Sequence, residues 1–345
     1  MKHMFRLFCA GGLLAASAAT VAAQDTITLR HGTFLPSGVN GTIEGSDIFI
    51  SELDRLTDGK VKIEFYPAEQ AGKAKEALEL VKVGAIDIYE LGTGYLSASD
   101  VPLWGLLEAP NLVESVCDGT RAMRAVGDPG GILWQTQYEP LGIRILSYYV
   151  YPAYGPSASN KVVDSVDDLN GLKLRNAGGL MERTVSALGG IPIGITGPEV
   201  TQALQRGTID SWMGAYSSVR DYDYWRYSKY GATGFSLGTP GIFAAISEAK
   251  FQSLPEDVQN ALVEAGKAAE ENFCAFMDQD EAKAIEDLQT EEYGSMTIYT
   301  WTPEQVEELD AATSGVVDAW VQDLESRGIP AQQALDDYKA ALAQE

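Results

Sequence analysis

The chain has 345 residues, with 49 Asp and Glu against 25 Lys and Arg, so its formal net charge at pH 7 is −24. A protein this acidic repels nucleic acid and anionic membranes, which argues against both as partners. The same field repels a free anionic ligand, so a site for an acid needs a localised positive side chain. The length is sufficient for two α/β domains.

Residues 1–23 have the pattern of a cleaved signal peptide. Lys2 and Arg6 precede an apolar run over residues 7–19, and Val21-Ala22-Ala23 forms a small-x-small cleavage site. The apolar run is too short to span a membrane. We therefore expect a protein that is exported to the periplasm and does not itself span the membrane.

Beyond this cut the chain keeps two cysteines, Cys117 and Cys274, and one histidine, His31. Export permits a disulfide between the cysteines, but their separation in sequence leaves their distance open. The chain has no Cys-x-x-Cys pair and no His/Cys cluster, so we expect neither a metal site nor a cofactor. Since no nucleophile motif stands near His31, we expect a protein that is not an enzyme.

The first part of the mature chain alternates strand and helix patterns. Residues 26–31 alternate as a strand does, and the loop after them is expected to place Phe34 in a cleft. The patterns that follow predict a helix over residues 42–57, a strand over 61–65, a helix over 73–83 and a short strand over 86–88.

A short motif occurs twice in the chain. Gly84-Ala85-Ile86-Asp87 and Gly207-Thr208-Ile209-Asp210 each follow a helix pattern and open a short strand. This echo predicts two lobes of similar βα units that face each other. The loops after the two echoes are then expected at the mouths of the lobes. Their candidate ligand-binding residues are Glu90, Tyr95, Trp212, Met213 and Tyr216.

The middle of the chain contains the predicted crossings between the lobes. A strand over residues 143–149 is expected to cross to the second lobe, where Tyr154 is the tyrosine expected to reach a ligand. Residues 220–230 are rich in aromatic and charged side chains and predict a surface loop and helix. Strands over residues 233–236 and 242–246 are expected to return to the first lobe.

The C-terminal third predicts three helices. Ser253 and Glu256 have the spacing of a capping box with Pro255 in the first turn, and the helix pattern continues to about Glu292. Such a helix is roughly 55 Å long, more than the width of one small domain, so we expect it to span both lobes. Two further helices are expected, one from Thr302-Pro303 to near Gly328 and one from about Ala331.

One arginine is placed to bind an anion. Residues 172–174 alternate as a strand does, and Arg175 stands at the carboxyl end, where open α/β sheets bind ligands. Asn176-Ala177-Gly178-Gly179 follows as a mobile loop that includes Asn176 as a further candidate. A guanidinium group binds a carboxylate through two parallel hydrogen bonds. The alternative is that Arg175 is a surface strand residue paired with an acid.

Three linked blocks resemble a known family. Asp168-Leu169-x-Gly171-Leu172-Lys173-Leu174-Arg175, Ala187-Leu188-Gly189-Gly190-Ile191-Pro192 and Glu199-Val200-x-x-Ala203-Leu204-Gln205-x-Gly207-x-Ile209-Asp210 resemble the core pattern of the solute-binding proteins of TRAP transporters, the DctP family. The resemblance extends from about Thr26 to the C-terminus. It implies a two-lobed α/β periplasmic binding protein that closes on a small organic acid, binds its carboxylate through Arg175 and delivers it to TRAP membrane subunits.

The resemblance and the residue patterns together predict how the chain is divided. We expect the first lobe over residues 24–148, with 236–275 returning to it. We expect the second lobe over residues 149–235, with 276–345 packing against it and the hinge.

The side chains around Arg175 indicate the kind of acid. Trp212, Tyr95, Phe34 and Tyr216 are expected to form an apolar or aromatic wall, which favours a monocarboxylate with an apolar or aromatic body. The alternatives are a C4-dicarboxylate ligand, Trp212 in the core rather than the wall, a binding protein of the ABC type, or a secreted enzyme using carboxylates such as Glu69 and Glu90.

Overall fold

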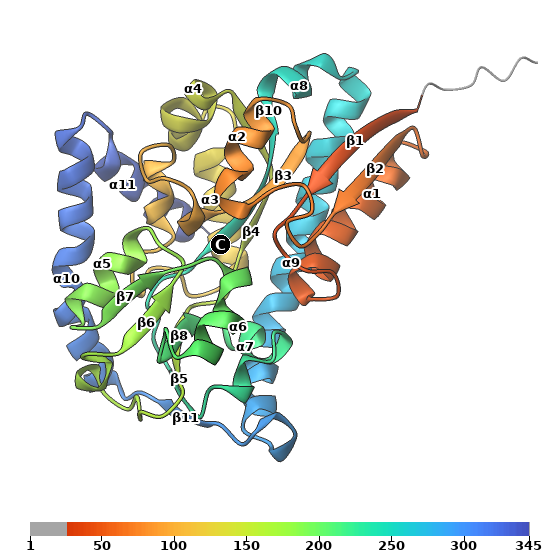
Figure 1. Ribbon diagram of the computed structural model, residues 1–345. Helices are drawn as coiled ribbons and strands as arrows, with labels where there is room; N and C mark the ends of the chain where they lie inside the picture. The colour runs from red at the N-terminus through yellow and green to blue at the C-terminus, as the bar shows by residue number, and fades with distance from the viewer. Residues whose placement is uncertain (1–25, 345) are drawn as a thin grey trace, which may run out of the picture.

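The described residues form two lobes, each built on one β-sheet (Figure 1). The computed structural model describes residues 26–344, so the predicted signal peptide lies outside the described residues. Each sheet mixes parallel and antiparallel strands, and the lobes share a long helix. The prediction of a two-lobed α/β fold with a helix spanning both lobes is therefore confirmed.

The first sheet has the strand order β2-β1-β3-β10-β4. Strands β1, β2 and β3 are parallel, and β10 runs antiparallel to both β3 and β4. The strands are β1 (Ile27–Gly32), β2 (Val61–Tyr66), β3 (Ile88–Gly92), β4 (Ile143–Val150) and β10 (Gly241–Ser247).

The second sheet has the strand order β11-β9-β5-β8-β6-β7. Strands β6, β7 and β8 are parallel, and β5 runs antiparallel to β8 and β9. The strands are β5 (Gly155–Ala158), β6 (Lys173–Asn176), β7 (Ile191–Gly194), β8 (Ser211–Gly214), β9 (Tyr230–Thr233) and β11 (Thr297–Thr300).

Helices pack around the two sheets. Their bounds are α1 (Ile48–Leu56), α2 (Ala77–Lys82), α3 (Val116–Gly127), α4 (Glu139–Leu141), α5 (Leu180–Ala187), α6 (Gly197–Arg206), α7 (Tyr216–Asp221), α8 (Glu248–Ser253), α9 (Glu256–Leu288), α10 (Pro303–Ser326) and α11 (Ala331–Leu342). A glycine with positive φ follows each of the helices α2 and α6. Its φ is +71° at Gly84 and +65° at Gly207, a backbone conformation that residues with a side chain rarely adopt. Both helices lead into a strand in the middle of a sheet, but β3 and β8 begin only after the Ile-Asp pair of each motif. Glu90 and Trp212, which were expected in loops, therefore stand in strands.

The long helix α9 holds the two lobes together. It has 33 residues, so it is about 50 Å long. It packs against α1, α3 and β4 of the first lobe and against α7 of the second. Figure 1 shows α9 running along the side of both sheets.

The predicted capping box of this helix is wrong, and the helix ends about four residues before the predicted end. Ser253 is the last residue of α8, and its hydroxyl donates to the carbonyl of Lys250, so it caps nothing. Leu254 is extended because it precedes a proline, and Pro255 occupies the position before α9. At the other end, Gln289 follows the last helical residue, and Gly294 closes a separate short turn.

Carboxylates on α9 bind the first turn of one helix in each lobe. Asp278 accepts a hydrogen bond of 2.8 Å from the backbone N–H of Val116, at the start of α3. Glu281 accepts bonds of 2.7 and 2.9 Å from the backbone N–H groups of Tyr216 and Ser217, at the start of α7. A carboxylate stabilises free N–H groups at a helix N-terminus, so α9 anchors both α3 and α7.

A disulfide joins the same two helices of the first lobe. Cys117 in α3 is bonded to Cys274 in α9, with their Cα atoms 4.8 Å apart and a sequence separation of 157 residues. The sequence left this pairing open. The bond fixes α3 on α9 next to the cap that Asp278 makes.

Two segments cross between the lobes at the hinge. One connects β4 to β5, and the other connects β9 to β10. The strand predicted over residues 233–236 is wrong, because β9 ends at Thr233 and belongs to the second sheet. Gly234 has φ +93°, a conformation that breaks the strand, and Asn111 of the first lobe accepts from the backbone N–H of Ser236.

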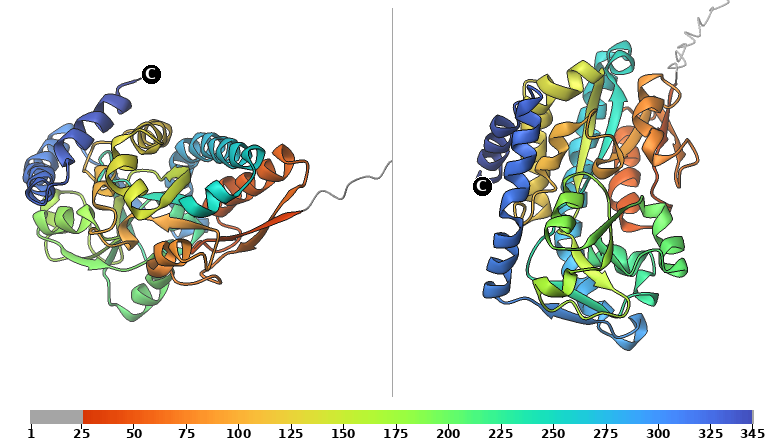
Figure 2. Two further views of the ribbon diagram at one scale, coloured as in Figure 1. Left: turned by 90° about the horizontal axis from the view of Figure 1, so that it is seen from above. Right: turned by 60° about the vertical axis from the view of Figure 1, so that its left-hand side comes forward.

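The C-terminal helices differ from the expected division of the chain. Helix α10 contacts α5 of the second lobe, but α11 packs against α3 of the first lobe. Tyr338 of α11 and Trp320 of α10 belong to the first lobe's hydrophobic core. Figure 2 shows α10 and α11 side by side along one flank of the molecule. Residues 276–345, which were expected to pack against the second lobe and the hinge, therefore also pack against the first lobe.

Candidate functional site

A cavity lies between the lobes, at the carboxyl ends of β3 and β6. The space in it that is not filled by atoms is about 550 Å³, part of which is open to solvent. Both lobes and both crossing segments line it. The lining residues are Phe34, Leu35, Gly92, Thr93, Gly94, Tyr95, Tyr151, Tyr154, Arg175, Ala177, Gly197, Trp212, Ser218, Tyr222, Tyr224, Pro240, Gly241 and Ile242.

Arg175 is the one charged residue among those that line this cavity. It stands in β6 and is only 2% exposed. Its Nε donates to the carbonyl oxygen of Ile195 at 3.0 Å, and its Nη2 donates to the hydroxyl of Tyr95 at 3.2 Å. Within residues 26–344 no Asp or Glu lies within salt-bridge distance of the guanidinium group. The alternative that Arg175 is a surface residue paired with an acid is therefore wrong.

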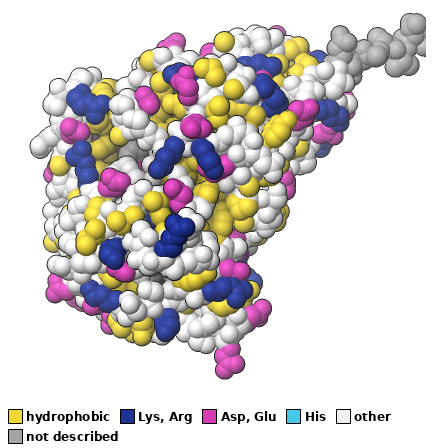
Figure 3. All heavy atoms as spheres, in the orientation of Figure 1, with side chains coloured by type: hydrophobic (Ala, Val, Ile, Leu, Met, Phe, Trp, Pro, Cys, Tyr) yellow, Lys and Arg dark blue, Asp and Glu magenta, His cyan; other side chains and the backbone are white. Residues whose placement is uncertain are grey.

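A buried cation without an anion costs free energy, and neutral oxygens offset that cost only in part. On the face drawn in Figure 3, basic side chains are interspersed with acidic ones and form no continuous basic surface. Arg175 therefore supplies the localised positive charge that an acidic protein needs in order to bind an anion.

Aromatic side chains form the rest of the wall. Trp212 in β8 is opposite Arg175 in the sheet register, and the ring centroid lies 6.0 Å from the guanidinium carbon. It packs edge-to-face with Tyr224 at 4.8 Å. Its indole Nε1 is buried and has no hydrogen-bond partner within the described residues. Trp212 therefore belongs to the second lobe's packing and to the cavity wall at once.

The first lobe adds an aromatic pair on the other side. Phe34, in the loop after β1, packs edge-to-face with Tyr95 at 5.1 Å. The Tyr95 hydroxyl accepts from the backbone N–H of Gly197 at 2.7 Å, at the first residue of α6. A capping box of Thr196 and Glu199 holds this helix start in place. Tyr95 therefore contacts the second lobe at two points.

Burial keeps the hydroxyl groups of Tyr151, Tyr154, Tyr222 and Tyr224 protonated at ordinary pH. Burial raises the pKa of Tyr151, Tyr154 and Tyr222 above the ordinary value of a tyrosine. Burial likewise raises the pKa of Tyr224, whose hydroxyl donates to the carbonyl oxygen of Gly197. A neutral phenol donates one hydrogen bond and accepts others, so these groups suit oxygen atoms on a ligand.

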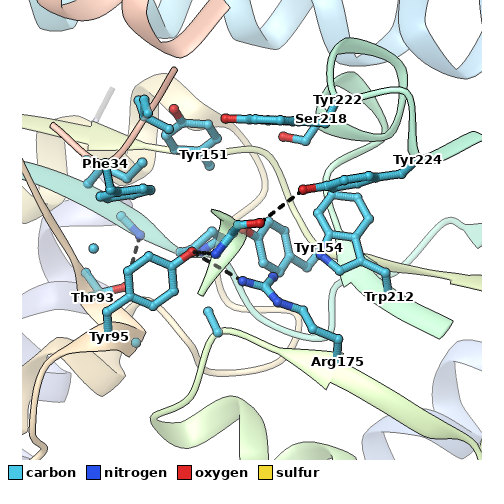
Figure 4. A pocket seen from close by; sticks show the side chains of 18 residues that line it. Phe34, Thr93, Tyr95, Tyr151, Tyr154, Arg175, Trp212, Ser218, Tyr222 and Tyr224 are labelled. Carbon is cyan, nitrogen blue, oxygen red and sulfur yellow. Dashed lines mark hydrogen bonds between the residues drawn. The ribbon is translucent and has the colours of Figure 1, made fainter. Parts of the chain in front are cut away.

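Five candidate residues meet at this cavity. Phe34, Tyr95, Tyr154, Arg175 and Trp212 all line it, although they come from segments far apart in sequence (Figure 4).

Glu90 and Tyr216 do not line the cavity. Glu90 is 1% exposed inside the first lobe, where it accepts from the hydroxyl of Ser46 at 2.6 Å and lies 3.3 Å from Nε2 of His31. The Tyr216 side chain lies inside the second lobe, where its hydroxyl donates to the backbone carbonyl oxygen of Pro156. It lines a separate groove at the hinge. Both side chains already have partners inside their own lobe.

The side chains of Asn176 and Met213 do not line the cavity but lie next to residues that do. The side-chain oxygen of Asn176 accepts from the backbone N–H of Gly178 at 2.8 Å and shapes the turn after β6. The Met213 side chain is fully buried in the second lobe's core, because alternation in β8 turns it away from the face of Trp212. Only its carbonyl oxygen faces Arg175, at 3.5 Å from Nη1.

Sequence reasoning missed Tyr151, Ser218, Tyr222 and Tyr224. The last two belong to residues 220–230, which were interpreted as a surface loop and helix. In the structure α7 ends at Asp221 and a short turn follows, which directs both tyrosine rings into the cavity. The high aromatic density was the available signal, since exposed loops rarely bury several large rings.

Within residues 26–344 no helix is long and apolar enough to cross a membrane. The same residues contain no group of three or more His, Cys, Asp or Glu side chains close enough to hold a metal ion.

The fold and the sequence both match known proteins. The model of bacterial extracellular solute-binding protein family 7, DctP, matches residues 42–323. A solute-binding protein of Verminephrobacter eiseniae is 28% identical over 276 residues, which cover 78% of each chain. The 2,3-diketo-L-gulonate-binding periplasmic protein of Escherichia coli is 26% identical over 285 residues, which cover 82% of this chain and 84% of the relative.

Two solved structures share the fold. A TRAP solute-binding protein of Rhodoferax ferrireducens, in complex with copurified benzoate, superposes with a TM-score of 0.83 at 23% identity, covering 92% of this chain and 98% of that one. A sugar-acid-binding protein of Advenella mimigardefordensis with galactonate gives a TM-score of 0.80 at 19% identity, covering 92% and 99%. The match over most of the sequence, with the two-lobed fold, shows that this chain belongs to the DctP family of extracellular solute-binding proteins.

Proposed function

We propose that this protein captures a small monocarboxylate with an aromatic or apolar body between its lobes and delivers it to the membrane subunits of a TRAP transporter. The observation that carries the proposal is Arg175, a buried guanidinium group without an acidic partner, in a cavity otherwise lined by neutral and mostly aromatic side chains. A carboxylate compensates this charge through short, charge-assisted hydrogen bonds.

The number of charges in the cavity favours one carboxylate over two. A dicarboxylate would leave its second charge against aromatic rings, because Arg175 is the one cation that lines the cavity. The aromatic rings favour a flat apolar body over a polyhydroxylated one, since sugar hydroxyls need many polar partners. Benzoate in the Rhodoferax ferrireducens relative is consistent with this choice, and galactonate in the other relative represents the alternative.

The export and delivery steps are part of the same proposal. The predicted signal peptide and the periplasmic relative support a periplasmic location. The wall supports capture rather than catalysis, because the described residues that line the cavity supply a cation and neutral side chains. In the proposed cycle the lobes close on the acid, and the closed form is what the membrane partner recognises.

Calorimetric titration with benzoate tests the assignment of Arg175. Each charge-assisted bond is worth ~1.5–3 kcal/mol, so Arg175→Ala is expected to weaken binding at least tenfold. Arg175→Lys is expected to restore it only in part, because an ammonium group lacks the planar fork. Arg226→Ala is the matched control, since Arg226 is exposed and pairs with Asp223. Wild-type affinity in the alanine variant would refute the proposal.

Two readouts accompany the titration. Ligand recovered unchanged after incubation, together with a raised melting temperature, separates binding from turnover. Tryptophan emission reports on the wall, because Trp212→Phe is expected to remove most of the change that ligand causes. An emission change that persists in full in this variant would place the ligand away from Trp212.

A further inference from the structure

The cavity has two chemically different ends. The guanidinium group of Arg175 and the hydroxyl of Tyr95 lie at one end (Figure 4). The hydroxyl groups of Tyr151, Ser218 and Tyr222 lie on the opposite side, above the rings of the wall. An acid held at Arg175 therefore directs its far end toward three hydroxyl groups.

Among residues 26–344 the far hydroxyl groups have no hydrogen-bond partner. The described residues provide no hydrogen bond to the side-chain oxygen of Tyr151, Ser218 or Tyr222, whereas the Tyr224 hydroxyl in the same wall is bonded to Gly197. The Tyr151 side chain is buried, at 8% exposed, whereas Ser218 and Tyr222 are partly exposed, so water reaches the far end until a ligand fills the cavity. A ligand oxygen there replaces water as the hydrogen-bond partner of these groups. The far end is therefore poised to bind a polar atom.

Packing holds the two phenols in position. The ring of Tyr222 stacks on Tyr224 with centroids 5.4 Å apart and an angle of 15° between the rings. The ring of Tyr151 packs against Phe273 of α9 at 5.1 Å, and Gly41 leaves the space that its hydroxyl occupies, since a methyl group there would overlap it. Fixed donors lose little entropy when a ligand binds, so they discriminate strongly.

We propose that Tyr151 and Tyr222, assisted by Ser218, determine specificity by hydrogen bonding to an oxygen substituent at the end of the ligand opposite its carboxylate. This inference rests on the proposed function and refines it, because the preferred ligand becomes a hydroxylated aromatic acid rather than a plain one. A site built to bind a hydroxyl group rejects the analogue that lacks it, since its own polar groups then stay unpaired.

The test compares benzoate, 3-hydroxybenzoate and 4-hydroxybenzoate by calorimetry. The wild-type protein is expected to bind at least one hydroxybenzoate tenfold or more tightly than benzoate. Tyr222→Phe and Tyr151→Phe are each expected to reduce the ratio of hydroxybenzoate affinity to benzoate affinity at least threefold. Tyr227→Phe is the control, because Tyr227 lies in the same segment outside the cavity and its hydroxyl bonds to Gln205.

The possible failures are distinguishable. Equal wild-type affinity for benzoate and both hydroxybenzoates would overturn the specificity inference and leave the proposed function standing. A preference that both phenylalanine variants keep in full would also overturn it. If no aromatic acid binds the wild-type protein, the proposed function itself fails. Melting temperatures of the variants show whether each one is folded, and the double variant checks that the two phenols act together.

Discussion

The hydroxyl of Tyr95, in the first lobe, accepts a hydrogen bond of 2.7 Å from the backbone N–H of Gly197, in the second lobe. The same hydroxyl accepts from Arg175 at 3.2 Å. One phenol thus joins the first residue of α6 and the buried cation to the opposite lobe. Contact between the lobes and orientation of the cation are therefore coupled.

Tyr95→Phe is expected to weaken ligand binding about three- to tenfold. The change leaves the N–H of Gly197 and one N–H of Arg175 without this acceptor, at a cost of ~0.5–1.5 kcal/mol. The faster dissociation is measured by stopped-flow displacement. Tyr66→Phe serves as the control, since its hydroxyl donates to Glu64 at the surface. Identical dissociation rates in the Tyr95 variant and the wild type would show that the bond carries no energy.

Arg175→Met is expected to leave the melting temperature of the ligand-free protein unchanged or raised, while abolishing stabilisation by ligand. Without an anion the buried guanidinium group destabilises the fold, so an apolar chain of similar length relieves that cost. Arg220→Met provides the contrast, because Arg220 bonds to both carboxylate oxygens of Asp280, at 2.9 and 2.7 Å. The free energy of unfolding of the Arg220→Met variant is expected to be about 1.5–3 kcal/mol lower than that of the wild type.

The comparison of these two arginines is made by thermal melts without ligand. A ligand-free Arg175→Met protein that melts as far below wild type as Arg220→Met does would mean that Arg175 is a structural residue with a partner of its own.

Gly94→Ala is expected to hinder closure of the lobes. A Cβ at Gly94, in the first lobe, would lie 2.5 Å from the carbonyl oxygen of Ala177, in the second lobe. Two lobes that move as rigid bodies about the hinge cannot approach to this distance with the extra methyl group. Ligand affinity is expected to fall, since ligand shifts the balance only through its preference for the closed form.

Small-angle scattering with and without a tightly bound acid is the measurement. The wild type is expected to become more compact with ligand, and the Gly94 variant is expected to respond less. Gly315→Ala is the matched control, because no atom lies near a Cβ at that position of α10. Identical scattering of the wild type in both states would rule out the closure mechanism.

Glu108→Gln is expected to change how stability depends on pH. The Glu108 carboxylate, from the first lobe, accepts from the backbone N–H of Leu180 at 2.6 Å, at the start of α5. Burial raises the pKa of Glu108 to about 7 from an ordinary value of 4.5. The folded protein therefore binds this proton more tightly than the unfolded chain does. Its contribution to stability is complete below about pH 4.5 and is lost as the pH rises through about 7.

The glutamine variant has no such titration. Relative to the wild type, its free energy of unfolding is expected to rise by up to about 3 kcal/mol between about pH 5 and about pH 8. Denaturant unfolding at both pH values measures the difference. Glu308→Gln, at an exposed residue of α10, is the control. A constant difference between Glu108→Gln and wild type at the two pH values would disprove the assignment.

Much of this protein follows from local sequence patterns. The alternation before Arg175 predicts a strand end, and the glycines after α2 and α6 predict helix ends, because these features depend on neighbouring residues only. The linked blocks around Arg175 predict the family and its two lobes. Arg175, Trp212 and Tyr95 were accordingly identified as candidates before their meeting place was known.

The tertiary structure alone decided which candidates face the ligand. Trp212 and Met213 are adjacent in β8 and point to opposite faces, and only the packing of the second sheet determines which face is the cavity. Tertiary packing likewise decides that Tyr216, the first residue of α7, lies inside the second lobe and that Tyr222, just after α7, lies in the cavity wall. The absence of an acidic partner for Arg175 within the described residues, and the pairing of Cys117 with Cys274, depend on contacts between segments far apart in sequence. No local pattern contains such distances, because the chain between the two segments adopts its path only when the core packs.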